Sequence, residues 1–372
     1  MQIVEASVRP CTQRLRDPNW KFARATVPQL DGHVLVLTDD AGCRGCGYVH
    51  AIPAITTHGD GAEAALAMLA PMLVGRRADD LAGIVEEIDA TLAFNPSVKA
   101  GIDMALHDLL ARRLGVPVHV LLGGRRHARI AQSRILAIKE PAETAAQAAA
   151  LAEQGYRTLK LKLSGDTPQD LTRIAEARSA AGPDVRLTLD PNQTYDAKQM
   201  MRAFARFERH DIALIEQPVP AADWAGLALL TRTLPVAVEA DESAQTVHDV
   251  FRLVSERACD VINLKVTKLG GLRRFMQAVR TCEAGGVTCR VGAAFGPALL
   301  QAMSLQAASV VNALPFACEL AEHLHLQDDP FTDLPVRHGA LDVPDTPGCG
   351  VAFAAAPAAR PSHDNPTPET HR

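Results

Sequence analysis

Hydrophobic and polar positions follow two different periods in the first third of the chain. In residues 1 to about 55 they alternate, as in VEASV and HVLVLTDDAGCRGCGYV, which predicts a small antiparallel sheet with a turn at Asp39–Gly42. From about residue 60 to 123 the apolar positions take a helical spacing in three runs, and Gly115 with Pro117 ends the last one. Strands followed by helices predict an α+β N-terminal domain over residues 1–125.

From about residue 128, short apolar runs alternate with helical segments. The candidate strands are RILAIK, TLKLKL, RLTLD, ALIEQ, AVEAD, VINLK, TCRVGA and PFACEL. Such repeated units are typical of an α/β parallel barrel or a doubly wound sheet, and eight strands are the number that a closed TIM-type barrel needs. We therefore expect a barrel over residues 126–327, a return to the first domain over 328–354, and a Pro-rich disordered tail over 355–372.

Composition limits the functional classes. The 372 residues are 47% hydrophobic and 22% charged, as in ordinary globular proteins, and the net charge of −5 offers no basic surface for nucleic acid. The first residues lack a long apolar stretch and no run is long enough to span a bilayer, so we expect a cytoplasmic protein without membrane contact. The eight scattered cysteines predict free thiols, and Cys43–Cys46, which has no partner motif for zinc, is interpreted as structural.

Charged residues close five successive apolar runs of the predicted barrel. They are Lys160 and Lys162 in TLKLKLSG, Asp190 in LTLDPNQ, Glu216 in ALIEQP, Asp241 in VEADES, and Lys265 with Lys268 in INLKVTKLGG. From Lys162 the successive intervals are 28, 26, 25 and 24 residues, and each has room for one βα unit. Because the C-terminal ends of barrel strands converge on one mouth, three acids would meet there between two groups of lysines.

This grouping predicts a particular chemistry. Three oxygen ligands suit a hard cation such as Mg²⁺, and lysines facing it suit the removal and return of a proton next to a carbonyl. A single aspartate at a βα loop is commonly a helix N-cap, so the interpretation depends on all three acids occurring in order.

These residues resemble the enolase superfamily, in particular its muconate-lactonizing-enzyme subgroup. That subgroup carries a K-x-K motif on the second barrel strand, Asp, Glu and Asp ligands on the next three strands, and a lysine on the sixth. IDMALHDLLARRLGVPVHVLLGG (Ile102 to Gly124) and DVPDTPGCGV also resemble segments of that family. The resemblance implies a modified barrel of seven or eight units with an α+β capping domain over its mouth.

The same resemblance implies roles for the charged residues. Asp190, Glu216 and Asp241 would hold Mg²⁺, for which Mn²⁺ could substitute. Lys162 and Lys265 would be acid/base catalysts on opposite faces of the substrate, with Lys160 contacting the substrate carboxylate or assisting Lys162. Asn192, Gln217, Glu242 and Lys268 would support these groups through hydrogen bonds or charge.

Other candidates lie around the predicted barrel mouth. The resemblance places Glu319 where some family members carry an acid that reaches the active site, although a salt bridge under the rim is the alternative. Phe295 would shape an apolar pocket. Two capping loops usually give specificity in this family, and the matching stretches here offer Trp20, Lys21, Arg24, Tyr48 and His50. Lys21 or Arg24 would suit a second anionic group, with exposed surface charge as the alternative, and His50 could equally be structural.

The leading interpretation is a Mg²⁺-dependent racemase or epimerase that acts through an enediolate on a small carboxylate, such as an N-acyl amino acid, a dipeptide or an amino-acid derivative. A muconate-type cycloisomerase or a dehydratase would use the same residues, so both remain open. An inert barrel serving as a binding protein is disfavoured because none of the ligands or lysines is missing. A homo-oligomer is expected.

Overall fold

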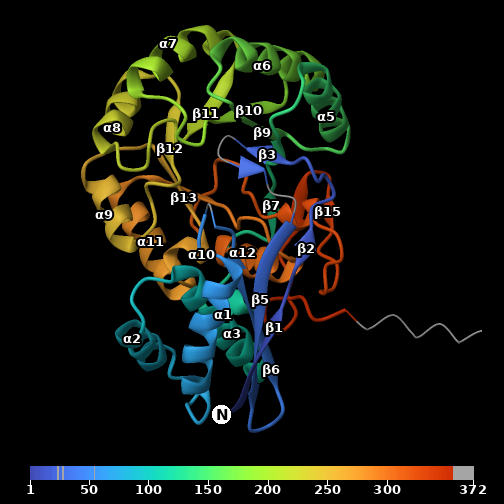
Figure 1. Cartoon of the computed structure of the whole chain (residues 1–372), viewed down its shortest axis with the longest axis vertical. Coiled ribbons are helices and arrows are strands. Elements are labelled where there is room, and N and C mark those ends of the chain that lie inside the picture. Colours follow the sequence, from blue (N-terminus) through green and yellow to red (C-terminus); the bar gives the residue numbers. More distant parts are fainter. Residues whose placement is uncertain (23–24, 27–28, 54, 355–372) are drawn as a thin grey trace, which may run out of the picture.

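The computed structural model describes residues 1–22, 25–26, 29–53 and 55–354, which form an α+β N-terminal part and a β/α barrel (Figure 1). Arg24 and the tail predicted over 355–372 lie outside the described residues. Within the described part, no helix is long and apolar enough to cross a membrane. All eight cysteines are free thiols.

The N-terminal part combines an antiparallel sheet with three helices. The sheet has the order β1-β5-β2, and β6 pairs with β5. Its elements are β1 (Ile3–Pro10), β2 (Gln13–Arg14), β5 (Gln29–Asp39), β6 (Arg44–Ala51), α1 (Gly59–Leu69), η1 (Ala70–Leu73), α2 (Leu81–Thr91) and α3 (Pro96–Leu114), with a small β3 (Lys21–Phe22) and β4 (Ala25–Thr26) ladder. The β5–β6 turn lies where the sequence predicts it, because Asp39 Oδ1 accepts the backbone N–H groups of Ala41 and Cys43 at 3.0 and 2.8 Å.

Helix α3 lies directly against β6, and two glycines permit the close approach. A Cβ atom on Gly47 would lie 1.9 Å from the carbonyl oxygen of Gly101, and a Cβ on Gly101 would lie 2.4 Å from the Val49 side chain. Any larger residue would overlap these atoms in the close-packed interior. The same helix reaches the barrel, since Asp103 accepts the backbone N–H of Leu272 at 2.5 Å.

Seven parallel strands form the barrel wall in the order β14-β13-β12-β11-β10-β9-β8. Their bounds are β8 (Arg134–Leu136), β9 (Thr158–Lys162), β10 (Arg186–Asp190), β11 (Ile212–Glu216), β12 (Ala237–Ala240), β13 (Val261–Leu264) and β14 (Thr288–Val291). The helices between them cover the outside, as Figure 1 shows for the arc from α5 to α9: α5 (Pro141–Glu153), α6 (Thr167–Ala181), α7 (Ala197–Phe207), η2 (Glu208–His210), α8 (Trp224–Thr233), α9 (Val247–Ser255), α10 (Val266–Leu269), α11 (Leu272–Gly285) and α12 (Ala298–Ala308).

The eighth predicted strand, PFACEL, closes the barrel without forming a regular strand. Cys318 makes an isolated parallel bridge to Gln132, and Glu319 makes one to Gly292. Each contact is a single bridge that does not extend into a ladder. The structure is therefore a TIM-type barrel of seven strands and one closing segment. The short helix η3 (Glu322–His325) follows at once.

The last part of the chain pairs with β7 and then contacts α3. Strands β15 (Val336–Arg337) and β16 (Ala340–Asp342) form a three-stranded sheet with β7 (Arg129–Ala131). The short helix α4 (Val118–Leu121) precedes β7 in the chain. Beyond β16, the Cys349 backbone N–H donates to Asp108 Oδ1 at 2.7 Å, and Arg112 donates to the Val351 carbonyl at 2.7 Å. Residues after 340 thus contact both the barrel and the N-terminal part.

Candidate active site

The charged residues singled out in the sequence meet at the C-terminal edge of the barrel sheet. Lys162, Asp190 and Glu216 are the last residues of β9, β10 and β11, while Asp241 and Lys265 directly follow β12 and β13. Strands β9 and β10 are paired with Asp190 opposite Lys162. Above them is a cavity of about 340 Å³, whose wall includes Lys160, Lys162, Asn192, Asp241, Glu242, Lys265, Lys268, Phe295 and Glu319.

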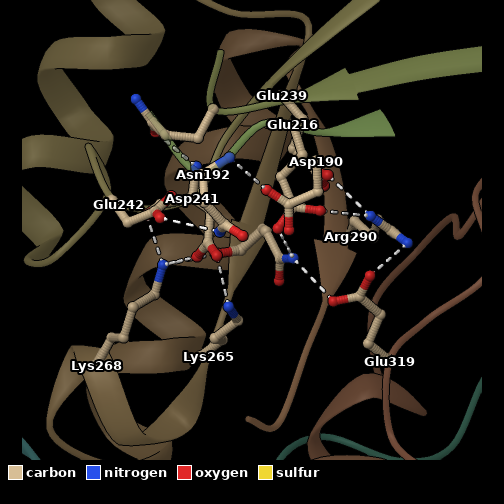
Figure 2. Close-up of polar contacts among 12 residues, drawn as sticks. Asp190, Asn192, Glu216, Glu239, Asp241, Glu242, Lys265, Lys268, Arg290 and Glu319 are labelled. Atoms are coloured by element: carbon tan, nitrogen blue, oxygen red, sulfur yellow. Dashed lines mark hydrogen bonds and ion pairs between the residues drawn. The ribbon is translucent and has the colours of Figure 1, made fainter. Parts of the chain in front are cut away.

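The lysines at the cavity wall are paired with two different aspartates. Lys162 Nζ lies 2.5 Å from Asp190 Oδ2, and Lys265 Nζ lies 2.6 Å from Asp241 Oδ2. Lys268, on α10 one helical turn after Lys265, donates to the other oxygen of Asp241 and to its carbonyl. Figure 2 shows Lys265 and Lys268 approaching Asp241 together. The two lysine groups therefore stand on either side of the acids, at β9 and after β13.

Lys160 and Glu319 of the cavity wall belong to a buried ion network that links β9, β11, β14 and the closing segment. Lys160 Nζ lies 3.0 Å from Glu216 Oε2 and 2.7 Å from Glu319 Oε1. Arg290, which is fully buried, contacts Glu216, Glu239 and Glu319 at 3.2, 2.8 and 2.8 Å (Figure 2). Buried charges are stable only when paired in this way, so the network fixes these side chains.

The pKa shifts show where negative charge is undercompensated. Burial raises the pKa of Glu216 well above its usual value, and the nearby charge of Asp190 raises it further, despite Lys160. Burial and then Asp241 also raise the pKa of Glu242. Burial opposes the charged form of Lys265, but Asp241 and Glu216 outweigh it, so the pKa of this lysine is raised. Burial thus disfavours the charged forms of Glu216 and Glu242, whereas nearby acids stabilise the charged form of Lys265.

This charge distribution fits a divalent cation. Asp190, Glu216 and Asp241 are carboxylates on adjacent strands, the donor type that Mg²⁺ prefers, and one buried oxygen of Glu242 beside them has no hydrogen-bond partner. Among the described residues, no three His, Cys, Asp or Glu side chains are already grouped so that they could hold a metal. Lysine ammonium groups contact Asp190 and Asp241 instead. Metal binding would therefore require these aspartates to give up a lysine contact and bind the cation in its place.

Backbone geometry positions the side chains next to the acids. Asn192 and Gln217 have positive φ angles of 46° and 37°, which are rare outside glycine and place both residues in tight turns at the strand ends. Asn192 accepts from Lys162 at 3.0 Å and donates to Glu242 at 3.3 Å. Gln217 accepts the backbone N–H groups of Asp241 and Ser243, both at 3.0 Å.

Family models match nearly the whole chain. Residues 3–123 match the model described as Mandelate racemase / muconate lactonizing enzyme, N-terminal domain, and residues 143–356 match the model described as Enolase C-terminal domain-like. The chain belongs to the mandelate racemase / muconate lactonizing enzyme family. Within the enolase superfamily, it falls in the muconate-lactonizing-enzyme subgroup.

Relatives of this family member are epimerases and cycloisomerases. The L-Ala-D/L-Glu epimerase of Bacillus subtilis is 32% identical over 364 residues, covering 95% of this chain and 98% of the relative. Muconate cycloisomerase 1 of Rhodococcus opacus is 33% identical over 287 residues, covering 76% and 77%. The solved structure of a substrate-liganded complex of the B. subtilis epimerase matches with a TM-score of 0.91 and 30% identity, over 96% of this chain and 100% of that one.

A second solved structure, the dipeptide epimerase of Enterococcus faecalis complexed with Mg and the dipeptide L-Leu-L-Tyr, also has a TM-score of 0.91. Its identity is 27%, and the match covers 95% of this chain and 100% of that one. The family member described here is accordingly an isomerase of the enolase superfamily.

The capping-loop candidates are distributed unevenly around the cavity of this family member. Trp20 is buried and packs edge-on against Phe295, which lines the cavity, with ring centroids 5.5 Å apart. Tyr48 is fully buried with its hydroxyl beside Gly32, so it belongs to the core rather than to the cavity wall.

Among the described residues, the charged and histidine candidates of the capping loops do not line the cavity. Lys21 is exposed and lines a separate surface hollow near Lys139. His50 is buried with Nδ1 bonded to Thr56 Oγ1 at 3.0 Å. Arg24 lies outside the described residues.

Sequence reasoning missed three polar residues of the buried network. Glu239 lies two positions before Asp241, and Asn263 lies two before Lys265. Because alternate side chains of a strand share a face, both point to the same side as the functional residue that follows them. Asn263 approaches Glu216 and Glu319 at 3.4 and 3.5 Å. The third residue, Arg290, is a charged residue inside the predicted strand TCRVGA, and this position could have indicated a buried ion pair.

Proposed function

We propose that this isomerase is a Mg²⁺-dependent racemase or epimerase that exchanges the α-proton of an amino-acid-derived carboxylate, such as a dipeptide or an N-acyl amino acid. One observation carries the proposal: Lys162 at the end of β9 and Lys265 after β13 flank the three acids carried by β10, β11 and β12. Two amines on opposite sides of one site are what inversion at a carbon requires, because one removes the proton and the other returns it on the opposite face.

The residues would have different roles in the reaction according to their positions. Asp190, Glu216 and Asp241 would hold the cation, which supplies positive charge next to the substrate carboxylate as negative charge develops there. Lys162 and Lys265 would exchange the proton at the α-carbon, and each is only 12% exposed, which limits exchange with solvent. Lys160, in the cavity wall, is held by Glu216 and Glu319, a position suited to orienting the substrate carboxylate rather than to carrying the proton.

The relatives support the choice of substrate class. The match to the B. subtilis L-Ala-D/L-Glu epimerase extends over nearly the full length of both chains, and the similar E. faecalis epimerase was solved with a dipeptide and Mg. A cycloisomerase is the second candidate, because muconate cycloisomerase 1 of R. opacus is 33% identical to this chain. A dehydratase would use the same lysines, with loss of a leaving group after proton removal.

A deuterium-exchange screen tests the proposal. Purified protein with Mg²⁺ in D₂O is incubated with pooled dipeptides, N-acyl amino acids, hydroxyproline-type acids, sugar acids and muconate-type acids. Deuterium uptake at the α-carbon with inversion and no other change in mass is the expected result. A product lighter by water, or a new lactone, would replace epimerisation by dehydration or cycloisomerisation.

A further inference from the structure

A very short helix carries Lys268 and depends on its neighbours for its position. Helix α10 has only four residues, Val266–Leu269, and begins directly after Lys265. One helical turn is not stable alone, because isolated helices shorter than about 12–15 residues are marginal in water. Two glycines with positive φ angles, Gly270 at 84° and Gly271 at 121°, join α10 to α11. The position of Lys268 is therefore set by the contacts that hold this junction.

An aspartate of the N-terminal part holds the junction. Asp103, on α3, is buried, and its Oδ2 accepts the backbone N–H of Leu272, the first residue of α11, at 2.5 Å. An N–H group at a helix start has no partner within the helix, and the helix dipole favours a carboxylate there. A Cβ atom on Gly271 would lie 2.5 Å from the Asp103 side chain, so a larger residue would prevent this contact. Asp103 thus supplies the side-chain cap that a glycine cannot provide.

Asp103 is itself fixed within α3. One helical turn later, His107 lies with its Nδ1 3.3 Å from Asp103 Oδ2 and 2.8 Å from the Asp103 carbonyl oxygen. Burial opposes the charged form of His107, but the charge and hydrogen bonds of Asp103 outweigh burial and raise the pKa of the ring. Because α3 also packs closely on β6 at Gly47 and Gly101, the Asp103 carboxylate stands on a firmly held element.

On the other side of the junction, α10 places Lys268 on Asp241. The Lys268 ammonium donates to Asp241 Oδ1, to the Asp241 carbonyl at 2.6 Å and to the Asn263 carbonyl at 3.3 Å. Lys265 Nζ lies 2.6 Å from the second carboxylate oxygen, Oδ2, so one carboxylate contacts both lysines (Figure 2). A shift of α10 would move Lys268 together with the backbone of Lys265, the residue that directly precedes the helix.

A second contact between the N-terminal part and α11 is a weaker constraint. Asp89 on α2 pairs with Lys99 at 2.8 Å and with Arg274 on α11, and the Asp89 side chain is 32% exposed. Partly exposed ion pairs contribute little to stability, whereas hydrogen bonds to a buried charged group contribute more. Arg274 also lies beyond the glycine pair, on α11 itself. The buried bond of Asp103 is therefore the contact that bears most directly on α10.

We propose that Asp103 is a positioning residue for proton transfer. By holding the junction of α10 and α11 from the N-terminal part, it keeps Lys268 on Asp241 and so orients Lys265 toward the substrate α-carbon. This inference rests on the proposed function, since it assumes that Lys265 exchanges the α-proton. Asp103 does not line the cavity and acts only through α10. Its loss therefore impairs the proton transfer by Lys265 more than that by Lys162, which stands on β9.

Two pairs of matched variants test the proposal. Asp103→Ala removes the acceptor, and Asp103→Asn keeps an uncharged acceptor of the same shape. Asp108→Ala and Asp108→Asn make the same changes at a buried aspartate of the same helix, which bonds the backbone N–H groups of Cys46 and Cys349 instead. The rate of α-proton loss is measured at saturating Mg²⁺ for the L,L and L,D forms of Ala-Glu and Leu-Tyr. Lys265→Ala identifies the form whose proton Lys265 removes.

The expected result is a loss confined to one of the two proton transfers. Asp103→Ala should lower kcat for proton removal by Lys265 about 10- to 100-fold and leave removal by Lys162 within about threefold, because a small misplacement of one reacting group costs that much. Asp103→Asn should fall between wild type and Asp103→Ala, since a neutral acceptor forms a weaker hydrogen bond. The Asp108 variants should change both transfers equally. In hydrogen-exchange mass spectrometry without substrate, amide exchange over residues 265–272 should be faster only in the Asp103 variants.

Equal changes of both proton transfers in the Asp103 variants would overturn the proposal, because Asp103 would then have only a structural role. If Asp103→Ala does not fold, Asp103→Asn decides the question by the same comparison. Unchanged amide exchange over residues 265–272 would also overturn it. If wild type removes no α-proton from any carboxylate, the proposed function fails. Amide exchange requires no substrate, so in that case it still decides whether Asp103 holds α10 in place.

Discussion

At the scale of single residues, the two flanking lysines allow the proposed reaction to be separated into halves. In Lys265→Ala, racemisation should fall by about 10²- to 10⁴-fold while one enantiomer still exchanges its α-proton through Lys162, because general acid/base groups typically contribute that much. Lys162→Ala should show the opposite enantiomer preference. Chiral chromatography and mass spectrometry in D₂O measure both quantities.

Lys198→Ala, which changes an exposed lysine on α7, is the matched control and should behave as wild type. Racemisation at the full rate in either Lys162→Ala or Lys265→Ala would rule that lysine out as an acid/base catalyst.

Buried His50 makes the stability of the protein dependent on pH. Burial, followed by the charge of Lys265, lowers the pKa of His50 from 6.5 to about 3. Between these values the unfolded chain binds a proton that the folded protein does not, so the free energy of unfolding falls as the pH drops below 6.5. One such group contributes a slope of up to about 1.4 kcal/mol per pH unit.

Unfolding measured at pH 7.5 and at pH 5.0 tests this assignment. His50→Gln should reduce the loss of stability between the two conditions, by about 2 kcal/mol at most. His248→Gln, a change at an exposed position on α9, should leave the loss unchanged. The same pH dependence in His50→Gln as in wild type would assign the effect to other groups.

The sequence predicted residues whose signal is local and missed those whose role depends on distant neighbours. Lys162, Asp190 and Glu216 end apolar runs, and the structure brings them together because parallel strands end at one edge. Arg290 has three carboxylate partners on separate segments of the chain, and no local pattern specifies them. The position of Tyr48 depends on the packing of Gly32 and Gly296 around its ring, which alternation alone does not reveal.

At the scale of elements, the contact between α3 and β6 sets the strictest steric limit. Gly47→Ala should destabilise the protein by about 1–3 kcal/mol, because the new methyl group would overlap the Gly101 carbonyl and force the helix away from the strand. Chemical denaturation followed by circular dichroism measures the change.

Gly59→Ala, at the start of α1, is the matched control. A Cβ there would lie 3.6 Å from its nearest neighbour, so the change should be neutral or slightly stabilising. Equal stability of Gly47→Ala and wild type would mean that α3 and β6 can separate without cost.

The barrel elements show how far apolar runs can be interpreted. All eight runs lie in the barrel wall, but PFACEL forms only two isolated bridges, through Cys318 on one side and Glu319 on the other. Lys268 follows the apolar run VINLK but does not extend β13, because α10 begins at Val266 and brings the Lys268 side chain to Asp241. Hydrophobicity gives the position of a segment in the wall, whereas its hydrogen bonding depends on where the neighbouring strands stop.

At the scale of the whole molecule, a bound cation should stabilise the folded protein against unfolding. At Mg²⁺ concentrations 100-fold above Kd, the added stability is about 2.7 kcal/mol if only the folded protein binds the metal. Calorimetric scans with Mg²⁺ and with a chelator should therefore differ in thermal midpoint. Asp241→Asn should abolish the difference, whereas Asp184→Asn, at an exposed position, should retain it.

Asp241→Asn should also be less stable than wild type in the presence of the chelator, because Lys265 and Lys268 lose their shared counter-ion. An undiminished Mg²⁺ effect in this variant would show that the metal is held elsewhere.

The contacts of Asp108 join segments that lie far apart in the chain. This buried carboxylate accepts the backbone N–H of Cys46 on β6 and, through its other oxygen, that of Cys349, which lies 241 positions further along the sequence. The N-terminal part therefore completes its buried hydrogen bonds only when the segment after β16 is in place, so the two should fold and unfold as one cooperative unit.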